Sequence, residues 1–132
     1  MGAWGLKTFE NDDAGDWVFD LEETSDLSLV ESTLFGWSAD YLESPDVSCI
    51  LAAVEIVKAL QKGIDEDLPE DVKKWVFKHQ HLDATNLVSQ AVRSIDRILG
   101  EESELKELWE ETNEYDHWVA DVKKIKVTLQ DV

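Results

Sequence analysis

The sequence has little of what a disulfide-stabilised or nucleic-acid-binding protein needs. Among its 132 residues are one cysteine, two prolines and six glycines, so it cannot form an internal disulfide and long flexible linkers are not expected. Basic residues are also scarce: 12 lysines and arginines oppose 30 aspartates and glutamates, which gives a formal net charge of −18. Because nucleic acids and anionic membranes carry the same sign, this charge disfavours both as partners and favours a basic protein.

Long apolar runs are missing as well. The most apolar stretch, residues 45–62, contains Glu55 and Lys58 and is shorter than the roughly 20 apolar residues that span a bilayer. The opening has one basic residue, Lys7, and no apolar segment of signal-peptide length, so we expect no export by that route. Cys49 lies in the apolar stretch, where we expect a buried, reduced thiol and therefore a cytoplasmic protein.

Residues 45–62 predict the helix around which the other elements pack. Ser44 can cap its N-terminus, Pro45 suits its first turn and Gly63 can end it. Apolar side chains cover most of the helix circumference and leave a thin polar stripe, which we expect to face solvent and which consists of Ser48, Glu55, Lys58 and Gln61. Since a helix that is apolar nearly all round is buried by its neighbours, we expect one domain, residues 1–132, built around it.

The rest of the chain predicts further helices and no strand pair. We expect helices over residues 12–23, 25–36, 69–81, 83–100 and 103–129, and a short helical turn at 37–43. The last helix is expected to break near Asn113. Residues 1–10 have no helical period, and we interpret them as an extended arm whose Trp4 and Phe9 pack into the body. The predicted fold is therefore all-α, a compact bundle of about six helices with an N-terminal arm.

The opening of the chain resembles that of a known family. Residues 1–5 read Met-Gly-Ala-Trp-Gly, and residues 9–17 read Phe-Glu-Asn-Asp-Asp-Ala-Gly-Asp-Trp. This motif is similar to that of domain-of-unknown-function family 4259, whose small acidic proteins open in the same way; Leu6 and Gly15 depart from the pattern. Weaker similarities follow at residues 41–45, 53–57, 68–69 and 103–111. The resemblance implies a shared fold over nearly the whole chain, and it implies no activity because the family has none assigned.

Four oxygen-bearing side chains lie at the start of the first predicted helix, namely Asn11, Asp12, Asp13 and Asp16. A tight turn could bring them together on Mg²⁺ or Ca²⁺, which prefer oxygen ligands, and Trp4 or Trp17 could form one wall of a small-ligand site. Helix capping explains the same residues, because Asn and Asp side chains accept hydrogen bonds at helix N-termini. The spacing lacks the central glycine and distal glutamate of a calcium-binding loop. We therefore assign no metal and no other cofactor.

Other patterns that could carry chemistry are incomplete. Glu114 and His117 make a single Glu-x-x-His step, whereas helical di-iron sites need two such steps and further carboxylates. His79 and His81 lack a third ligand in the sequence nearby. Cys49 has no neighbour in the sequence that would stabilise a thiolate. We identify no catalytic residue and favour a non-catalytic protein.

The last predicted helix begins with the densest run of acids. Between Glu101 and Asp116, eight acids accompany one base, Lys106. Like charges three or four residues apart cost roughly a few tenths of a kcal/mol per pair in a helix. A surface that steers a partner electrostatically would explain why the acids are present despite this cost. The alternative is that they are an ordinary solvated surface. Trp109 and Trp118, in and just after this run, are either core residues or interface anchors.

The charge pattern leads to two hypotheses. The first is an interaction protein, such as an inhibitor or immunity-like protein, that binds a basic protein through Glu104, Glu107, Glu110, Glu111 and Glu114. The second is a protein that binds a small ligand or a divalent metal at the turn formed by residues 11–16. The oligomeric state stays open.

Overall fold

A computed structural model of the chain describes residues 8–37 and 40–131. Over these ranges it contains seven α-helices and a 3₁₀ helix, together with an isolated β-bridge between Leu42 and Ser103. The elements are α1 Asp12–Leu21, α2 Ser28–Phe35, α3 Ser44–Lys62, α4 Glu70–Lys78, η1 Thr85–Leu87, α5 Val88–Leu99, α6 Glu104–Glu110 and α7 Tyr115–Gln130. The prediction of an all-α protein is confirmed.

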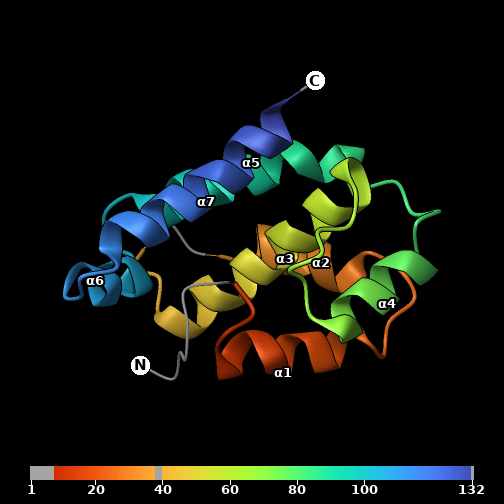
Figure 1. Cartoon of the computed structure of the whole chain (residues 1–132), viewed down its shortest axis with the longest axis horizontal. Coiled ribbons are helices and arrows are strands. Elements are labelled where there is room, and N and C mark those ends of the chain that lie inside the picture. The colour runs from red at the N-terminus through yellow and green to blue at the C-terminus, as the bar shows by residue number, and fades with distance from the viewer. Residues whose placement is uncertain (1–7, 38–39, 132) are drawn as a thin grey trace.

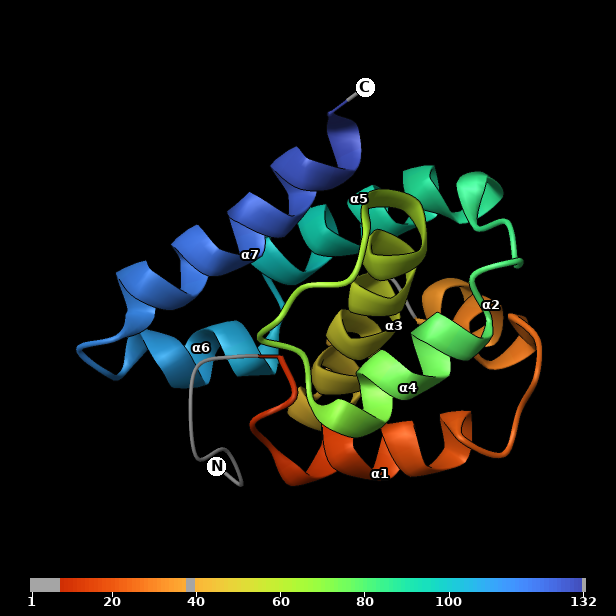
Figure 2. The same ribbon diagram turned by 45° about the vertical axis from the view of Figure 1, so that its right-hand side comes forward.

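The central position predicted for residues 45–62 is confirmed, since α3 contacts each of the other α-helices that the structure describes. In both ribbon views α1 lies on one side of α3, and α5 and α7 lie on the opposite side (Figures 1 and 2). The α3 side chains of Val54, Ile56 and Val57 are completely inaccessible to solvent. This burial follows from a helix that is apolar on most of its circumference.

The N-termini of the helices are stabilised by only some of the predicted residues. Asn11 caps α1 as predicted, because its Oδ1 accepts the backbone N–H of Ala14 at 2.8 Å. The predicted cap at Ser44 is wrong: Ser44 is the first residue of α3, and its N–H donates to Oε1 of Glu104 on the distant α6 at 2.7 Å. The N-terminus of α3 is therefore capped by a carboxylate from another helix, whereas the N-terminus of α1 is capped by the residue directly before it.

The second helix also begins differently from the prediction. The helix predicted over residues 25–36 is shorter in the structure, where α2 starts only at Ser28. Asp26 satisfies that start, since its Oδ1 accepts the backbone N–H of Ser28 at 3.0 Å. Gly36 follows the last residue of α2 as expected.

The helical turn predicted for residues 37–43 is wrong where the structure describes it. Leu42 forms a parallel bridge with Ser103: its N–H donates to the carbonyl of Glu102, and its carbonyl accepts the N–H of Glu104, both at 2.8 Å. Arg97 adds hydrogen bonds from its guanidinium to the carbonyls of Asp40 and Glu102. These contacts join segments far apart in the sequence, which is why the local pattern of residues 37–43 did not reveal them.

The long C-terminal helix breaks as predicted, so the structure has α6 and α7 in place of one helix. Residues 111–114 separate them, and the hydroxyl of Thr112 accepts the N–H of Glu114 at 3.1 Å. Trp109 is 7 % and Trp118 2 % exposed, so both are core residues. The alternative that they are interface anchors is therefore excluded by their burial.

Of the predicted arm, Phe9 packs against the core as expected, while Trp4 lies outside the described residues. Within the described ranges no helix combines the length and the apolar composition that crossing a membrane requires.

Candidate functional site

The polar stripe of α3 forms the floor of a cavity, which we call the α3 cavity. Its volume is about 480 Å³. The floor consists of Ser44, Ser48, Leu51, Glu55 and Lys58. These positions are three or four residues apart and so share one face of the helix. The expectation that this stripe faces solvent is wrong for three of its four residues: Ser48 is buried, and Glu55 and Lys58 are mostly covered.

The walls of the α3 cavity come from distant parts of the chain. Apolar wall residues on α6 and α7 are Leu105, Trp109, Trp118, Val122 and Ile125. The opposite wall includes Thr8 and Phe9 before α1 and the segment from Asp67 to Pro69 before α4. More than half of the described lining residues are polar or charged, and most of the apolar ones gather on the α6 and α7 side. The volume of the hollow lies within the ~300–1,000 Å³ typical of small-molecule sites.

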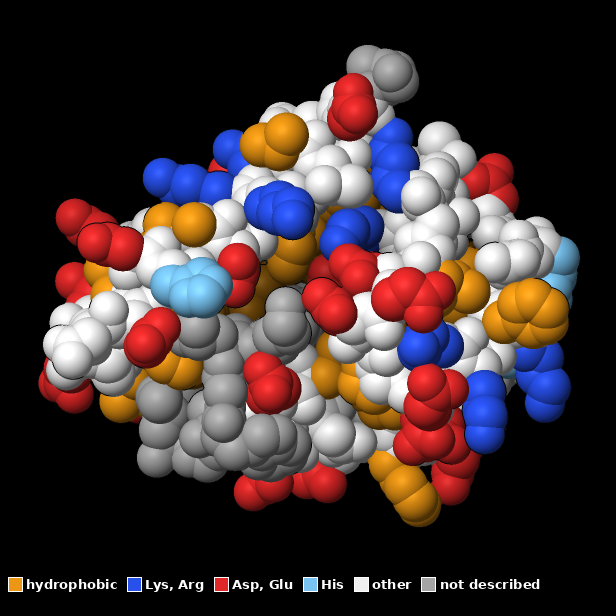
Figure 3. Space-filling view, in the orientation of Figure 1, with side chains coloured by type: hydrophobic (Ala, Val, Ile, Leu, Met, Phe, Trp, Pro, Cys, Tyr) orange, Lys and Arg blue, Asp and Glu red, His pale blue; other side chains and the backbone are white. Residues whose placement is uncertain are grey.

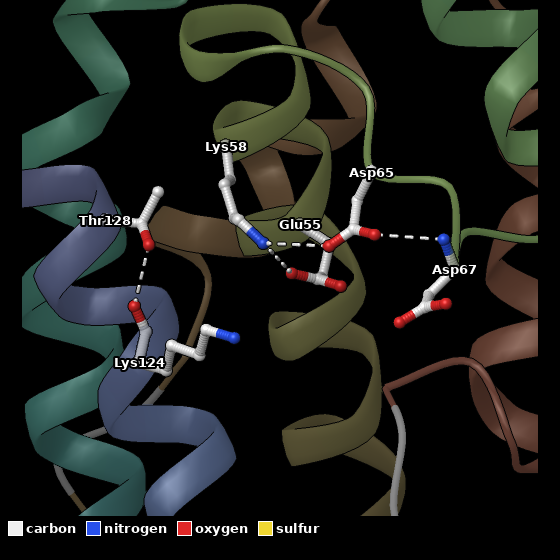
Figure 4. Close-up of polar contacts among 6 residues, drawn as sticks. All are labelled: Glu55, Lys58, Asp65, Asp67, Lys124 and Thr128. Carbon is white, nitrogen blue, oxygen red and sulfur yellow. Dashed lines mark hydrogen bonds and ion pairs between the residues drawn. The ribbon is translucent and has the colours of Figure 1, made fainter.

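Charged groups meet on the floor of the α3 cavity (Figure 4). The Lys58 Nζ lies 3.8 Å from Oε1 of Glu55 and 3.7 Å from Oδ2 of Asp65. Both distances exceed the ~2.7–2.9 Å of a tight charge-assisted hydrogen bond. The Lys124 side chain extends from α7 toward α3 in the same view. The side chains of Glu55 and Lys58 are only 13 % and 19 % exposed, so these charges are poorly hydrated.

The predicted Asn11–Asp16 cluster is only partly brought together. Asn11 is occupied as the cap of α1, and its Nδ2 donates to the carbonyl of Thr8 at 3.0 Å. Asn11 and Asp13 both line the α3 cavity, whereas Asp12 and Asp16 are exposed on α1 outside it. Within residues 8–37 and 40–131 no group of three or more His, Cys, Asp or Glu is placed to hold a metal.

The tryptophans expected to form a wall beside that cluster do not do so in the described structure. Trp17 is buried, and its indole N–H donates to the Thr33 hydroxyl of α2 at 3.0 Å, away from the α3 cavity. Trp4 lies outside the described residues. The aromatic wall of the cavity comes instead from Trp109 and Trp118, whose role as lining residues the sequence did not predict.

The five acids proposed to bind a partner divide into two groups. Glu104 and Glu107 bind other parts of the chain: Glu104 caps α3, and Oε1 of Glu107, which is itself exposed, accepts the Tyr41 hydroxyl at 2.9 Å. Desolvation, and then the Glu107 hydrogen bond, raises the pKa of Tyr41 to about 12. Glu110, Glu111 and Glu114 are exposed, and we call these three together with Asp116 the acidic end.

The acidic end occupies one extremity of the molecule. In the space-filling view, acidic side chains gather at the left, over α6 and the start of α7, and basic side chains follow α7 toward its C-terminus (Figure 3). Two ion pairs involve the acidic end: Lys106 lies 3.8 Å from Glu110, and Nδ1 of His117 lies 3.5 Å from Glu114. Both are long and solvent-exposed, and such pairs stabilise little.

The remaining titratable candidates are held in structural contacts. His79 is buried, stacks on Trp75 with ring centroids 4.2 Å apart, and places Nδ1 2.7 Å from the carbonyl of Trp75. Because a carbonyl only accepts, that ring nitrogen carries the proton. Burial, and then the nearby aspartates led by Asp13, raises the pKa of the Cys49 thiol to about 11. Cys49 is therefore a thiol at neutral pH, and a poor nucleophile.

The charged cavity residues that were not candidates from the sequence are Glu10, Glu55, Lys58, Asp67, Asp121 and Lys124. The signal was present for two of them, since a polar stripe on an otherwise apolar helix predicts that something other than core covers it. The residues that cover the stripe depend on where α6 and α7 pack against α3, and the local sequence pattern does not predict that packing.

Comparison with known proteins gives one match. A family model described as "Domain of unknown function (DUF4259)" matches residues 2–121. No curated protein and no solved structure matches the chain.

Proposed function

Because the chain belongs to the DUF4259 family, whose function is unknown, we propose a function from its own surface. The protein is a non-catalytic interaction protein that binds a basic protein partner through its acidic end. A basic enzyme held by such a protein would be inhibited, so an inhibitor or immunity-like role is included in the proposal. We also place it in the cytoplasm, where its unpaired cysteine would stay reduced.

The observation that carries this proposal is the exposure of the acidic end. Glu110, Glu111, Glu114 and Asp116 are all exposed within a short stretch. Lys106 is the one lysine or arginine in residues 101–116. Glu104 and Glu107 are less suited to a partner because they already bind Ser44 and Tyr41. The binding set is therefore narrower than the sequence pattern indicated.

The expected mode of binding is electrostatic steering. Opposed potentials raise the association rate constant, to about 10⁸–10⁹ M⁻¹ s⁻¹ in favourable cases at low salt. Salt weakens the effect, since the screening length falls from about 10 Å at 0.1 M to about 3 Å at 1 M. Affinity for the partner should accordingly fall steeply as salt is added.

The test compares two variants with the same change in net charge. The first neutralises the acidic end with Glu110→Gln, Glu111→Gln, Glu114→Gln and Asp116→Asn. The second neutralises exposed acids of α1 and the residues after it with Asp16→Asn, Asp20→Asn, Glu22→Gln and Glu23→Gln. Each immobilised protein is exposed to a lysate of the source cells at low and at high salt, and the retained proteins are identified by mass spectrometry.

We expect a basic protein to be retained by the wild type and by the α1 variant at low salt only. The acidic-end variant should lose it. Equal loss from both variants would show that net charge alone drives retention, and the absence of any salt-sensitive partner of the wild type would contradict the proposal.

A further inference from the structure

We propose that the α3 cavity is a binding site for a small organic cation, an ammonium group carried on an apolar body. This site is separate from the acidic end, and its ligand is independent of the partner proposed above. The proposal depends on three features of the described residues: the charge of the lining, its aromatic wall and the covered charges on its floor.

The lining is net negative. Five of the described lining residues are acids and two are lysines. The acids are Glu10, Asp13, Glu55, Asp67 and Asp121, and the lysines are Lys58 and Lys124. Lys58 also lies 3.7 Å from Asp65, an acid that is not itself among the lining residues (Figure 4), so the acids at and beside the cavity outnumber its two lysines. A positively charged guest is therefore favoured over an anionic one.

The aromatic wall fits the same class of ligand. Trp109 and Trp118 both line the cavity, and tryptophan is the side chain that attracts a cation most strongly to its ring face. Leu105, Val122 and Ile125 extend the wall with aliphatic surface, which suits the hydrocarbon part of an amine. The volume of about 480 Å³ is within the range of small-molecule sites.

The floor of the cavity carries charged side chains at covered positions, where apolar side chains would pack without a cost in lost hydration. Charges removed from water lose hydration energy, and well-packed apolar side chains are often as stable as the ion pair they replace. Lys58 has a structural use, since it reaches Asp65 in the loop after α3. Glu55 is placed one turn earlier, under the cavity, with its side chain 13 % exposed, where a carboxylate can face a bound ammonium group.

The test uses the full chain and three probes that share one ring. They are 2-phenylethylammonium, the neutral 2-phenylethanol and the anionic phenylacetate, each titrated by calorimetry. Indole N–H signals in ¹H–¹⁵N NMR spectra report contact with Trp109 and Trp118, assigned through Trp109→Phe and Trp118→Phe. We expect the ammonium to bind at least tenfold more tightly than the alcohol, the anion not to bind, and these two indole signals to move.

Two substitutions should act in opposite directions. Glu55→Gln should weaken binding of the ammonium at least tenfold, and Lys58→Met should strengthen it, because one removes an attractive charge and the other a repulsive one. Glu66→Gln is the matched control: Glu66 has a side chain 96 % exposed and does not line the cavity, so the same change in net charge should leave the affinity unchanged.

Three results would overturn the proposal. Tighter binding of phenylacetate, with the effects of Glu55→Gln and Lys58→Met reversed, would make the cavity an anion site. Lys7 is the only lysine or arginine before Lys58. Binding that occurs only in a Lys7→Gln variant would show that the Lys7 ammonium group competes with the probe for the lining. Binding unaffected by Glu55→Gln would place the ligand elsewhere.

Discussion

The two sides of α3 differ in what covers them. Its apolar side, which includes Val54, Ile56 and Val57, is sealed by the surrounding helices, and no solvent reaches these side chains. Its polar stripe is covered almost as well, yet by the walls of a cavity and not by tightly packed side chains. One helix therefore serves both as the core of the fold and as the floor of the candidate ligand site.

This difference shows that polarity on a helix does not by itself mean exposure to solvent. A solvated stripe would have let Glu55 and Lys58 extend freely, whereas both are mostly covered and lie near each other. The apolar side should therefore determine stability and the stripe should determine binding. Each prediction below alters one of these two surfaces or a contact that supports them.

The largest effect is expected on the apolar side. Ile56→Ala removes a side chain that is fully buried in α3, and such a change costs about 2–5 kcal/mol through lost burial and the void that remains. Urea unfolding followed by circular dichroism measures the loss. The matched change on the exposed surface, Val127→Ala on α7, should cost much less because that side chain is 65 % exposed. Similar losses for both would mean that α3 is not the centre of the core.

The next effect concerns Cys49, on the α1-facing flank of α3. Its pKa is raised from 9.0 to about 11, so at pH 8 its thiolate population should be roughly 100-fold below that of an unperturbed cysteine. Labelling by a disulfide reagent should be slower by about that factor than in a denatured control, and its rate should rise as pH increases toward 11. Because the folded state holds the proton more tightly, stability should fall as pH rises from about 9 through 11. Fast labelling of the native protein at pH 8 would contradict this environment for Cys49.

The fold was largely predictable and the site was not, for a physical reason. Residues 45–62 carry a local signal, since apolar side chains all round a helix predict burial whatever the partners are. Asn11 as a cap and the break near Asn113 are also local, and both are confirmed. Ser44 failed as a cap because the group that replaces it, Glu104, comes from another helix.

The α3 cavity could not be predicted because its walls are assembled by tertiary folding. Trp109 and Trp118 lie on different helices, and Leu51 lies far from both in the sequence, yet all three line one hollow. The acid run showed the same limit: the sequence could not distinguish Glu104, which is half-buried and accepts the Ser44 N–H, from Glu111, which is exposed. Periodicity identifies the face of a helix, and only the packing of helices decides what that face meets.

A smaller effect is expected where α6 supports the start of α3. Glu104→Ala removes the carboxylate that accepts the Ser44 N–H, and loss of a helix cap of this kind costs about 0.5–2 kcal/mol. Glu111→Ala, at the exposed residue directly after α6, should change the free energy of unfolding by less than about 0.5 kcal/mol. Thermal unfolding of both variants gives the comparison. If the two variants melt together, the contact between Glu104 and α3 contributes nothing to stability.

The smallest change in stability is expected for the substitution that most directly tests the comparison between the two sides of α3. The double variant Glu55→Leu/Lys58→Met makes the stripe apolar, and replacing a covered ion pair with apolar side chains is commonly neutral or stabilising. Its free energy of unfolding should stay within about 1 kcal/mol of the wild type, whereas Glu55→Leu alone should cost more because Lys58 keeps its charge. Binding of 2-phenylethylammonium should be lost in the double variant. A double variant several kcal/mol less stable than the wild type would mean that both sides of α3 serve the fold, and the separation of core from site on this helix would no longer hold.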